Sequence, residues 1–277
     1  MSASRRVALP AGIALLLAAC SAQSATPSSS ATLAPSPTAS QPTATSSVVP
    51  LTLVGLGDSI PGAAGCEGCS YVIKYGDLAA RALDVPVSVT NLATNDSLTA
   101  AGLLTRVGNR YRDAVARADL ITLTIGTNDW QAACDWPGDE ACWAAGAASV
   151  PQDLDAILGV IETLRAGRPT VIRVTTYYDW YIGFPTNLTS FGDPNGGMPQ
   201  EFLDFYRPAL EAFNASICDV AERHHATCVD LHGLFNGPEH DQAASGLLAD
   251  DHTHANQAGH DLIADAIADV GFAPLGP

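Results

Sequence analysis

Short apolar segments alternate with helical patterns from residue 51 onward, and this alternation constrains the fold more than any other feature. Five segments rich in β-branched and other apolar residues predict strands, over 51–56, 85–92, 120–125, 171–176 and 227–231. Between and after them, apolar residues recur at helical spacing, over 71–83, 98–115, 154–164, 202–220 and 262–270. Strands that are joined through helices pair in parallel, with helices on both faces. We therefore expect an α/β fold, a three-layer α/β/α sandwich with a five-stranded, mainly parallel sheet.

Polar residues come directly after two of the predicted strands. Ser59 follows the first strand, and Asn128 follows the third. In a parallel sheet the carboxyl ends of the strands lie at one edge, and ligands bind outside that edge. We expect Ser59 and Asn128 to meet there.

The first 50 residues have a composition unlike that of the rest of the chain. Arg5 and Arg6 precede an apolar run that is typical of a secretory signal and too short for a permanent membrane span. The run ends in Leu-Ala-Ala followed by Cys20, which resembles the bacterial lipobox and implies a lipid on the Cys20 sulfur; an ordinary signal peptide is the alternative. Residues 21–50 are mostly Ser, Thr, Ala and Pro and carry no charge, which predicts an extended tether. The expected parts are a signal peptide over 1–19, a tether over 20–50 and one folded domain over 51–277.

Six cysteines follow Cys20, an even number that in an exported protein predicts three disulfides. They lie in close pairs along the sequence, and we expect the bridges Cys66–Cys69, Cys134–Cys142 and Cys218–Cys228. A zinc site is the alternative for the first pair, but no second Cys-x-x-Cys accompanies it.

The chain is strongly acidic, with a formal net charge of −16. Such a charge argues against binding to nucleic acid and against electrostatic attraction to anionic lipid. We expect a monomer at the extracellular face of the cell envelope that contacts the membrane only through its lipid.

Two polar motifs far apart in the sequence carry the residues of a nucleophilic hydrolase. One is Gly57-Asp58-Ser59, and the other is Asp251-His252-Thr253-His254. A serine hydroxyl becomes a nucleophile when a base takes its proton, and a carboxylate orients that base. We interpret Ser59 as the nucleophile and Asp58 as a structural residue that bonds nearby backbone. Pro61 stands where the α/β-hydrolase motif Gly-x-Ser-x-Gly has its second glycine, which argues against that scaffold.

Four blocks in chain order resemble the SGNH (GDSL-type) hydrolase family. They are Gly57-Asp58-Ser59-Ile60, Asn91-Leu92-Ala93, Gly126-Thr127-Asn128-Asp129, and Asp251-x-x-His254 with Asn256. The resemblance covers the folded part and implies a flavodoxin-like sheet and an esterase or lipase without metal or organic cofactor. Carried over by position, it implies Ser59 as nucleophile, His254 as base and Asp251 as its orienting carboxylate. The Ser59 N–H and the Asn128 side-chain amide would bind the oxyanion.

The second block departs from that family, which has a glycine about five residues after its Asn and uses the glycine N–H as a third oxyanion donor. Residues 94–97 here are Thr, Asn, Asp and Ser. We expect the N–H of Asn95, or else that of Asp96, to replace it, because both residue types tolerate left-handed geometry. An Asp96 carboxylate that pointed inward would oppose the oxyanion, and loss of one donor lowers a rate by about 10²–10³.

Other residues that could bear on function lie in loops. Aromatic residues after the third and fourth strands would line an acyl pocket, form a sugar platform or complete the core; they are Trp130, Trp136, Trp143, Tyr177, Tyr178, Trp180, Tyr181 and Phe184. Residues 183–199, rich in Gly and Pro, are expected to form a mobile wall of the cleft. His252 is expected only to flank the motif, and five more histidines are expected at the surface or as caps: His224, His225, His232, His240 and His260.

The function expected from these residues is the hydrolysis of carboxylic esters through an acyl-enzyme. Short- or medium-chain acyl esters, or O-acetyl groups on glycans, are the expected substrates. A catalytically weak surface protein that binds glycans is one alternative, motivated by the missing glycine. A metal-dependent phosphoesterase that uses Asp251, His252 and His254 is the other.

Overall fold

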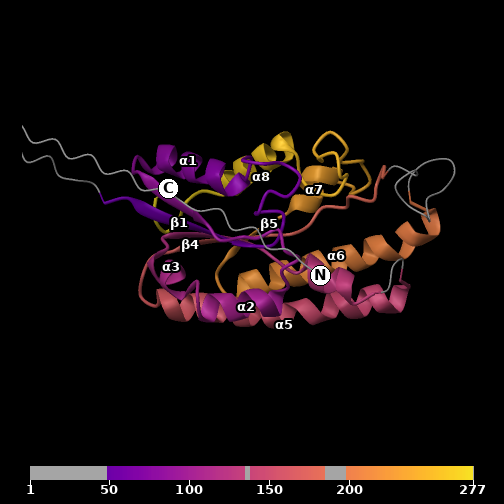
Figure 1. Ribbon diagram of the computed structural model, residues 1–277, viewed down its shortest axis with the longest axis horizontal. Helices are drawn as coiled ribbons and strands as arrows, with labels where there is room; N and C mark the ends of the chain where they lie inside the picture. The colour runs from indigo at the N-terminus through magenta and orange to yellow at the C-terminus, as the bar shows by residue number, and fades with distance from the viewer. Residues whose placement is uncertain (1–48, 135–137, 185–197, 277) are drawn as a thin grey trace, which may run out of the picture. The chain divides into compact units, whose positions relative to one another are not determined.

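The computed structural model describes residues 49–134, 138–184 and 198–276, and Figure 1 shows their arrangement. The expected signal peptide, the lipidated Cys20 and the tether up to residue 48 lie outside the described residues.

Five strands form one sheet in the order β2-β1-β3-β4-β5. Their bounds are β1 Leu51–Gly57, β2 Val87–Asn91, β3 Leu120–Thr124, β4 Val171–Thr175 and β5 Thr227–Val229. Every neighbouring pair is parallel, which confirms the sheet predicted from the alternation.

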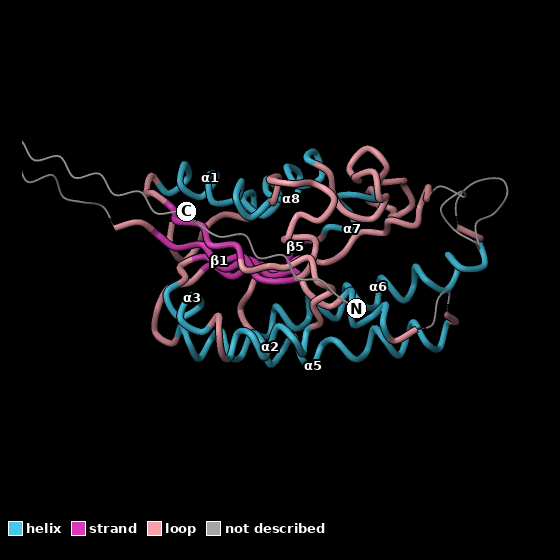
Figure 2. Tube along the Cα trace, viewed as in Figure 1, coloured by secondary structure: helices cyan, strands magenta, loops and turns pink. Residues whose placement is uncertain are grey.

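Helices cover both faces of this sheet, as Figures 1 and 2 show. On one face lie α1 (Tyr71–Leu83) and α8 (Gln257–Asp269), and on the other lie α2 (Ala100–Gly108), α3 (Arg112–Arg117), α5 (Glu140–Arg165) and α6 (Gln200–Arg223). Two short helices, α4 (Thr127–Ala132) and α7 (Leu231–Asn236), directly follow a strand or its connecting loop. Within the described residues, no helix is both long enough and apolar enough to cross a membrane.

Burial along the strands reflects their places in the sheet. Every residue of β3 and β4 is buried, because central strands are covered on both faces. In the edge strand β2, half-buried and exposed residues alternate. The central strands therefore provide a rigid base for the residues that follow β1 and β3.

Polar residues directly before the helices account for where several of them begin. Side-chain oxygens of Ser70, Thr99 and Asn256 accept hydrogen bonds from N–H groups in the first turns of α1, α2 and α8. These caps satisfy donors that a helix leaves unpaired. Because α2 and α8 follow the second and last sequence blocks, the caps also fix one end of each of those loops.

The helix predicted over 154–164 is longer than expected, since α5 begins at Glu140. Residues 141–148 are largely alanine, which favours helix but supplies little of the large-residue periodicity that marks one in a sequence. Asp139 caps this helix by accepting a hydrogen bond from the Cys142 N–H.

Most of the aromatic residues expected near the cleft are part of the core. Trp130 and Trp143 are buried, and their ring centroids lie 5.0 Å apart in an edge-on contact. Trp130 also stacks on Phe213 of α6, with centroids 5.0 Å apart. These rings fill the space between α4, α5 and α6, so they do not form a sugar platform. Trp136 and most of the segment 183–199 lie outside the described residues.

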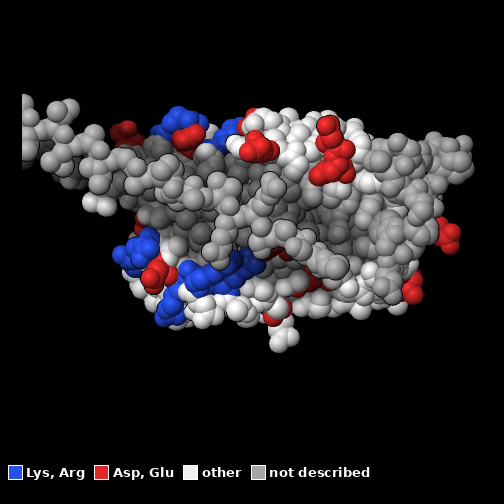
Figure 3. All heavy atoms as spheres, viewed as in Figure 1, with Lys and Arg blue, Asp and Glu red and all other residues white. Residues whose placement is uncertain are grey.

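Basic side chains lie in a few groups on the surface of this acidic chain. On the face shown in Figure 3, Lys and Arg side chains gather on the side of α2 and α3 and also near α1, and small groups of Asp and Glu lie beside them and elsewhere. The stretch from α2 through α3 contains four arginines, Arg106, Arg110, Arg112 and Arg117.

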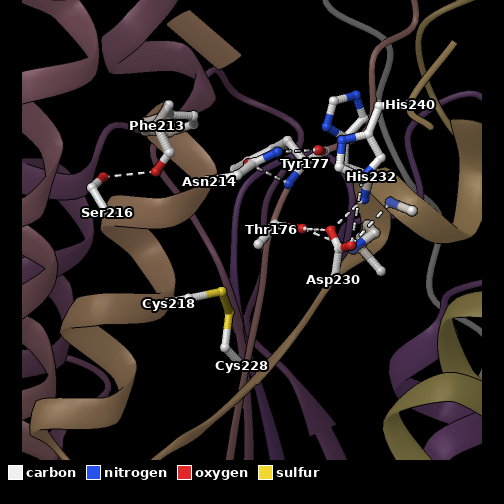
Figure 4. The surroundings of a disulfide bond; sticks show 12 residues. Thr176, Tyr177, Phe213, Asn214, Ser216, Cys218, Cys228, Asp230, His232 and His240 are labelled. Carbon is white, nitrogen blue, oxygen red and sulfur yellow. Dashed lines mark hydrogen bonds and ion pairs between the residues drawn. A yellow bond between two sulfur atoms is a disulfide. The ribbon is translucent and has the colours of Figure 1, made fainter. Parts of the chain in front are cut away.

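The three expected disulfides are present: Cys66–Cys69, Cys134–Cys142 and Cys218–Cys228. The second joins the end of α4 to the first turn of α5. The third joins α6 to β5, and Figure 4 shows it below the loops that follow β4 and β5. The zinc alternative for Cys66 and Cys69 is thereby replaced by a bridge.

Candidate active site

Ser59 is presented by a turn at the end of β1 that requires glycine. Gly57 has a φ of +133°, and a Cβ there would lie 1.9 Å from the carbonyl oxygen of Thr124 in β3. The next N–H, that of Asp58, donates to the same Thr124 oxygen, over 3.1 Å. The chain thus leaves the sheet in close contact with β3 and places a half-buried Ser59 just beyond the edge.

Ser59, His254 and Asp251 form a continuous chain of polar contacts. His254 Nε2 lies 2.9 Å from Ser59 Oγ, and His254 Nδ1 lies 2.7 Å from Asp251 Oδ2. The structure therefore brings together three side chains from opposite ends of the folded domain, as the motifs predicted.

The loop that carries Asp251 and His254 is held by its own hydrogen bonds. Asp251 Oδ1 accepts from the backbone N–H groups of Thr253 and His254, at 3.0 and 2.9 Å. Partial burial alone would raise the pKa of Asp251, but these N–H groups and the His254 ring outweigh it and lower that pKa below its usual value. Tyr178 Oη donates to the Thr253 carbonyl oxygen and ties the loop to the segment after β4.

A cavity of about 190 Å³ opens beside Ser59 and His254. Besides these two, its lining includes the predicted oxyanion residues Asn95 and Asn128 and the loop aromatic Trp180. Ile60, Ser97, Thr127 and Thr253, which also line it, come from the sequence blocks and the loop of the second block, whereas nothing in the motifs had singled out Ala64 or Gln131. Gln131 lies one turn after Asn128 on α4, so helical spacing is the one signal in the sequence that pointed to it.

Asn128 is fixed at the start of α4. Its Nδ2 donates to the Leu98 carbonyl oxygen over 3.0 Å. A carboxamide nitrogen carries two hydrogens, so one donor is left beside the cavity. The neighbouring Asp129, for which the sequence suggested no role, accepts from the Ala100 N–H at the start of α2 over 2.8 Å. Together these bonds hold α4 against the loop of the second block.

That loop, residues 94–97, differs from its expected geometry in one respect. The left-handed residue is Ser97, with a φ of +52°, and neither Asn95 nor Asp96 has a positive φ. Asn95 and Ser97 line the cavity, whereas Asp96 does not. The Asp96 carboxylate is paired with Arg106 over 2.9 Å, so the inward carboxylate considered from the sequence is not found.

Asp58, directly before Ser59, is completely buried and bonds as a structural residue. Its Oδ1 accepts from the Ile60 N–H over 3.1 Å, and its Oδ2 accepts from the Tyr177 hydroxyl. Burial raises the pKa of Asp58 to about 7, although both hydrogen bonds work in the opposite direction. Tyr177 was considered only as a cleft or core aromatic, and no spacing in the sequence pointed to this contact.

Two of the histidines expected at the surface or as caps are buried. His260 accepts a hydrogen bond from the Tyr71 N–H at its Nδ1, and burial lowers the pKa of His260 to about 4. His232 is also buried, with its pKa lowered to about 4 by burial. His240 stacks on the His232 ring at a centroid distance of 3.9 Å, beside the capping Asp230 (Figure 4).

The residues of the metal-site alternative do not converge on one point. Asp251 and His254 bond to each other, and the His252 ring lies against Phe184, with centroids 6.1 Å apart. No cluster of three or more His, Cys, Asp or Glu side chains in the described ranges is arranged to hold a metal ion.

Comparison with known proteins agrees with this geometry. The model of the GDSL-like lipase/acylhydrolase family matches residues 56–262. The lipase Lip_vut3 from a goat rumen metagenome is 18% identical, with a TM-score of 0.66, over 81% of this chain and 99% of that chain. The acetyl-xylooligosaccharide esterase Axe2 from Geobacillus, solved as a variant, is 20% identical, with a TM-score of 0.56, over 80% and 94%.

A third similar structure is phospholipase A1 from Streptomyces albidoflavus, which is 18% identical with a TM-score of 0.53, over 79% of this chain and all of that one (100%). No curated protein sequence gives a significant match. At such identities the structures establish the fold, and the family model, which spans most of the folded domain, establishes the family. The chain belongs to the GDSL-like lipase/acylhydrolase family, and it is an ester hydrolase with the SGNH fold.

Proposed function

We propose that the protein hydrolyses carboxylic esters through an acyl-enzyme formed on Ser59. The observation that carries the proposal is the unbroken contact from Ser59 Oγ through the His254 ring to Asp251, with distances of 2.9 and 2.7 Å. Nucleophile, base and orienting carboxylate within hydrogen-bond reach are the requirements of this chemistry.

The reaction proceeds in two steps. His254 Nε2 takes the Ser59 proton as Oγ attacks the ester carbonyl carbon, and the protonated ring then gives that proton to the departing alcohol. Water, deprotonated by the same nitrogen, attacks the acyl-serine and releases the acid and free Ser59. Asp251 holds the Nδ1 proton and stabilises the imidazolium in both steps.

The negative oxygen of each tetrahedral intermediate is bound by preorganised N–H donors. The Ser59 N–H and the free Asn128 Nδ2 hydrogen are the first two. The third comes from the Asn95–Ser97 segment, whose two outer residues line the cavity. Such donors act only where charge develops, so they lower the barrier rather than strengthen substrate binding.

A short acyl group on a hydroxyl-rich alcohol fits the site best. The cavity of about 190 Å³ is smaller than the roughly 300 Å³ or more that encloses a drug-sized ligand. Much of its lining carries amide or hydroxyl groups, from Asn95, Ser97 and Gln131 among others, which suits a sugar better than a second acyl chain. Axe2, whose name describes an acetyl-xylooligosaccharide esterase, has the same fold. We infer acetyl or similarly short esters of glycans.

We further propose that the enzyme is anchored outside the cell through a lipid on Cys20, as a monomer. The Leu-Ala-Ala-Cys ending of the apolar run supports this proposal. The uncharged tether would reach about 30 Å as a flexible coil. Cys20→Ser should release the protein into the medium, and unchanged membrane association would refute the anchor.

The test of the activity is hydrolysis of p-nitrophenyl esters, from acetyl to palmitoyl, by the full-length protein and by Ser59→Ala, with and without a chelator. We expect turnover that is highest on acetyl, absent in Ser59→Ala and indifferent to the chelator. Turnover that persists in Ser59→Ala would refute the acyl-enzyme, and loss of turnover on chelation would favour the metal-dependent alternative. Absence of turnover in the folded wild type would favour the glycan-binding alternative.

A further inference from the structure

Asp96 lies where its carboxylate, if it pointed into the cavity, would oppose the ester hydrolysis. Its two chain neighbours, Asn95 and Ser97, both line the cavity that contains Ser59. The Asp96 backbone is therefore close to the place where the negative oxygen develops. A carboxylate turned toward that oxygen would destabilise it, because like charges repel strongly in a partly desolvated site.

The Asp96 carboxylate is instead held by two partners away from the cavity. Arg106 Nη2 donates to Asp96 Oδ2 over 2.9 Å, and the Thr94 hydroxyl donates to Oδ1. Arg106 Nη1 also donates to Thr94 Oγ1 over 3.1 Å, which closes a ring of three side chains. These bonds lower the pKa of Asp96, with the Thr94 hydroxyl making the largest favourable contribution, so the group stays ionised and paired.

Arg106 can position the loop because α2 is itself fixed to the rest of the site. The start of α2 is bound by Asp129 of α4, next to Asn128, through the Ala100 N–H. The base of the loop is bound to β1, where the Thr94 N–H donates to the Gly57 oxygen over 3.2 Å. Between these two fixed points, the Arg106 and Thr94 contacts are the side-chain bonds that orient Asp96.

The hydrogen bonds among the Thr94, Asp96 and Arg106 side chains leave backbone N–H groups of this loop free. None of the hydrogen bonds between described residues uses the N–H of Asn95 or of Ser97. Both N–H groups belong to cavity-lining residues, and either is available to an oxyanion. The loop thus offers donors without a glycine, provided that its acidic side chain is directed elsewhere.

We propose that Arg106 is a positioning residue that holds the Asp96 carboxylate out of the oxyanion hole. The backbone of Asn95–Ser97 can then supply the third N–H donor, in place of the glycine that this chain lacks. The proposal rests on the ester hydrolysis proposed above. Arg106 and Asp96 act as a pair, because Arg106 is needed for the rate only while residue 96 carries a carboxylate.

The test compares Arg106→Gln, Asp96→Gly and their combination in the full-length protein on p-nitrophenyl acetate. Arg106→Gln should lower kcat by about 10²-fold with KM changed less than about twofold, since the lost interaction exists only in the transition state. Adding Asp96→Gly should restore kcat to within about threefold of the Asp96→Gly single variant, because no carboxylate then needs restraint. Arg112→Gln, at an exposed arginine on α3, is the matched control and should leave kcat unchanged.

A second readout separates positioning from general damage. The rate at which a phosphonate labels Ser59 should fall in Arg106→Gln and recover in the double variant, while the urea midpoint changes little. Asp96→Asn replaces Asp96→Gly if the glycine disturbs the fold. An unchanged kcat in Arg106→Gln overturns the proposal, and so does a low kcat that neither Asp96 substitution restores. Turnover that survives Ser59→Ala would instead refute the proposed function.

Discussion

The hydroxyl of Tyr177 donates a hydrogen bond to the buried carboxylate of Asp58, the residue that directly precedes Ser59. Tyr177 lies just after β4 and Asp58 just after β1, so this contact ties two strand ends together. A buried carboxylate is tolerated where its oxygens accept hydrogen bonds, and both Asp58 oxygens do so here. The turn that presents Ser59 therefore depends on a group whose ionisation changes with pH.

Replacing Asp58 with Asn should flatten the pH dependence of stability. The carboxyl has a pKa of about 7 in the folded protein, against 3.8 in the unfolded chain, because burial disfavours its charge. Between these values the folded protein binds a proton that the unfolded chain does not, so the free energy of unfolding falls as pH rises through about 7. The three-unit difference corresponds to as much as about 4 kcal/mol. Urea unfolding of both proteins from about pH 4 to about pH 8 measures this pH-dependent part of the free energy of unfolding.

Asp179→Asn is the control for that experiment. Burial raises the pKa of Asp179 to about 6. The neutral Asp179 carboxyl therefore also contributes to the free energy of unfolding at low pH, but this contribution is lost at a lower pH than that of Asp58, and Asp179→Asn should remove it. If the free energy of unfolding changes with pH equally in the wild type and in Asp58→Asn, Asp58 is not the group that causes the pH dependence.

Tyr177→Phe should destabilise the protein by about 1–3 kcal/mol, because it leaves Asp58 Oδ2 buried without its donor. Tyr75→Phe is a matched control: Tyr75 is also fully buried, but its hydroxyl has no hydrogen-bond partner among the described residues. Removing that hydroxyl should be neutral or stabilising. Both variants are measured by urea unfolding at neutral pH. If they lose the same free energy of unfolding, the hydrogen bond from Tyr177 to Asp58 does not contribute to stability.

Asp251→Asn should lower kcat by about 10³–10⁴ with little change in KM. Asp251 Oδ1 accepts two backbone N–H groups, so the Asn oxygen should remain there and its NH₂ should face His254 Nδ1. That arrangement places the ring proton on Nε2, where it cannot accept the Ser59 proton. Asp250→Asn, an exposed neighbour, should keep wild-type kcat. A small effect of Asp251→Asn on p-nitrophenyl acetate hydrolysis would exclude this orienting role.

Reduction of the disulfides should lower the free energy of unfolding, and most for Cys218–Cys228. That bridge closes a loop of 10 residues and joins α6 to β5, so we expect a loss of roughly 2–4 kcal/mol from Cys218→Ser with Cys228→Ser. The Cys66–Cys69 loop has a separation of 3 residues and should contribute less. Urea unfolding of the two double variants compares them, and a larger loss for the shorter loop would contradict the loop-length argument.

What the sequence predicted well was local or short-range. The helix over 71–83 has the predicted bounds, because its apolar spacing and the cap Ser70 agree. The motif residues meet because parallel strands end at one edge, a rule that needs no knowledge of side-chain packing. The first half of α5 was missed, since alanine gives no periodic signal.

Contacts that depend on tertiary packing were not predictable. Arg106 reaches Asp96 from the far turn of α2, and Tyr177 reaches Asp58 across the sheet. The burial of His260 depends on α8 lying against α1, and histidine is intermediate in its tendency to be buried, so its residue type does not predict the outcome. The positive φ at Ser97 was not predicted, because Asn and Asp adopt left-handed geometry more readily than Ser does.

Gly62→Ala should impair catalysis by displacing the loop that carries Asn95. A Cβ on Gly62 would lie 2.1 Å from Asn95 Oδ1, so the Asn95 side chain must turn away, and 3.0 Å from the Asp58 carbonyl oxygen and 3.2 Å from the Thr94 carbonyl carbon, so the two backbone segments must shift apart slightly. A misplacement near 1 Å can lower kcat by about 10²-fold, and this smaller shift should lower kcat by less. Gly246→Ala is the matched control, because a Cβ there meets no heavy atom within 4 Å. We expect kcat on p-nitrophenyl acetate to fall in the first variant alone. If Gly62→Ala instead keeps full kcat, Asn95 and its neighbours do not need their observed position, and the donor from this loop would have to be sought elsewhere.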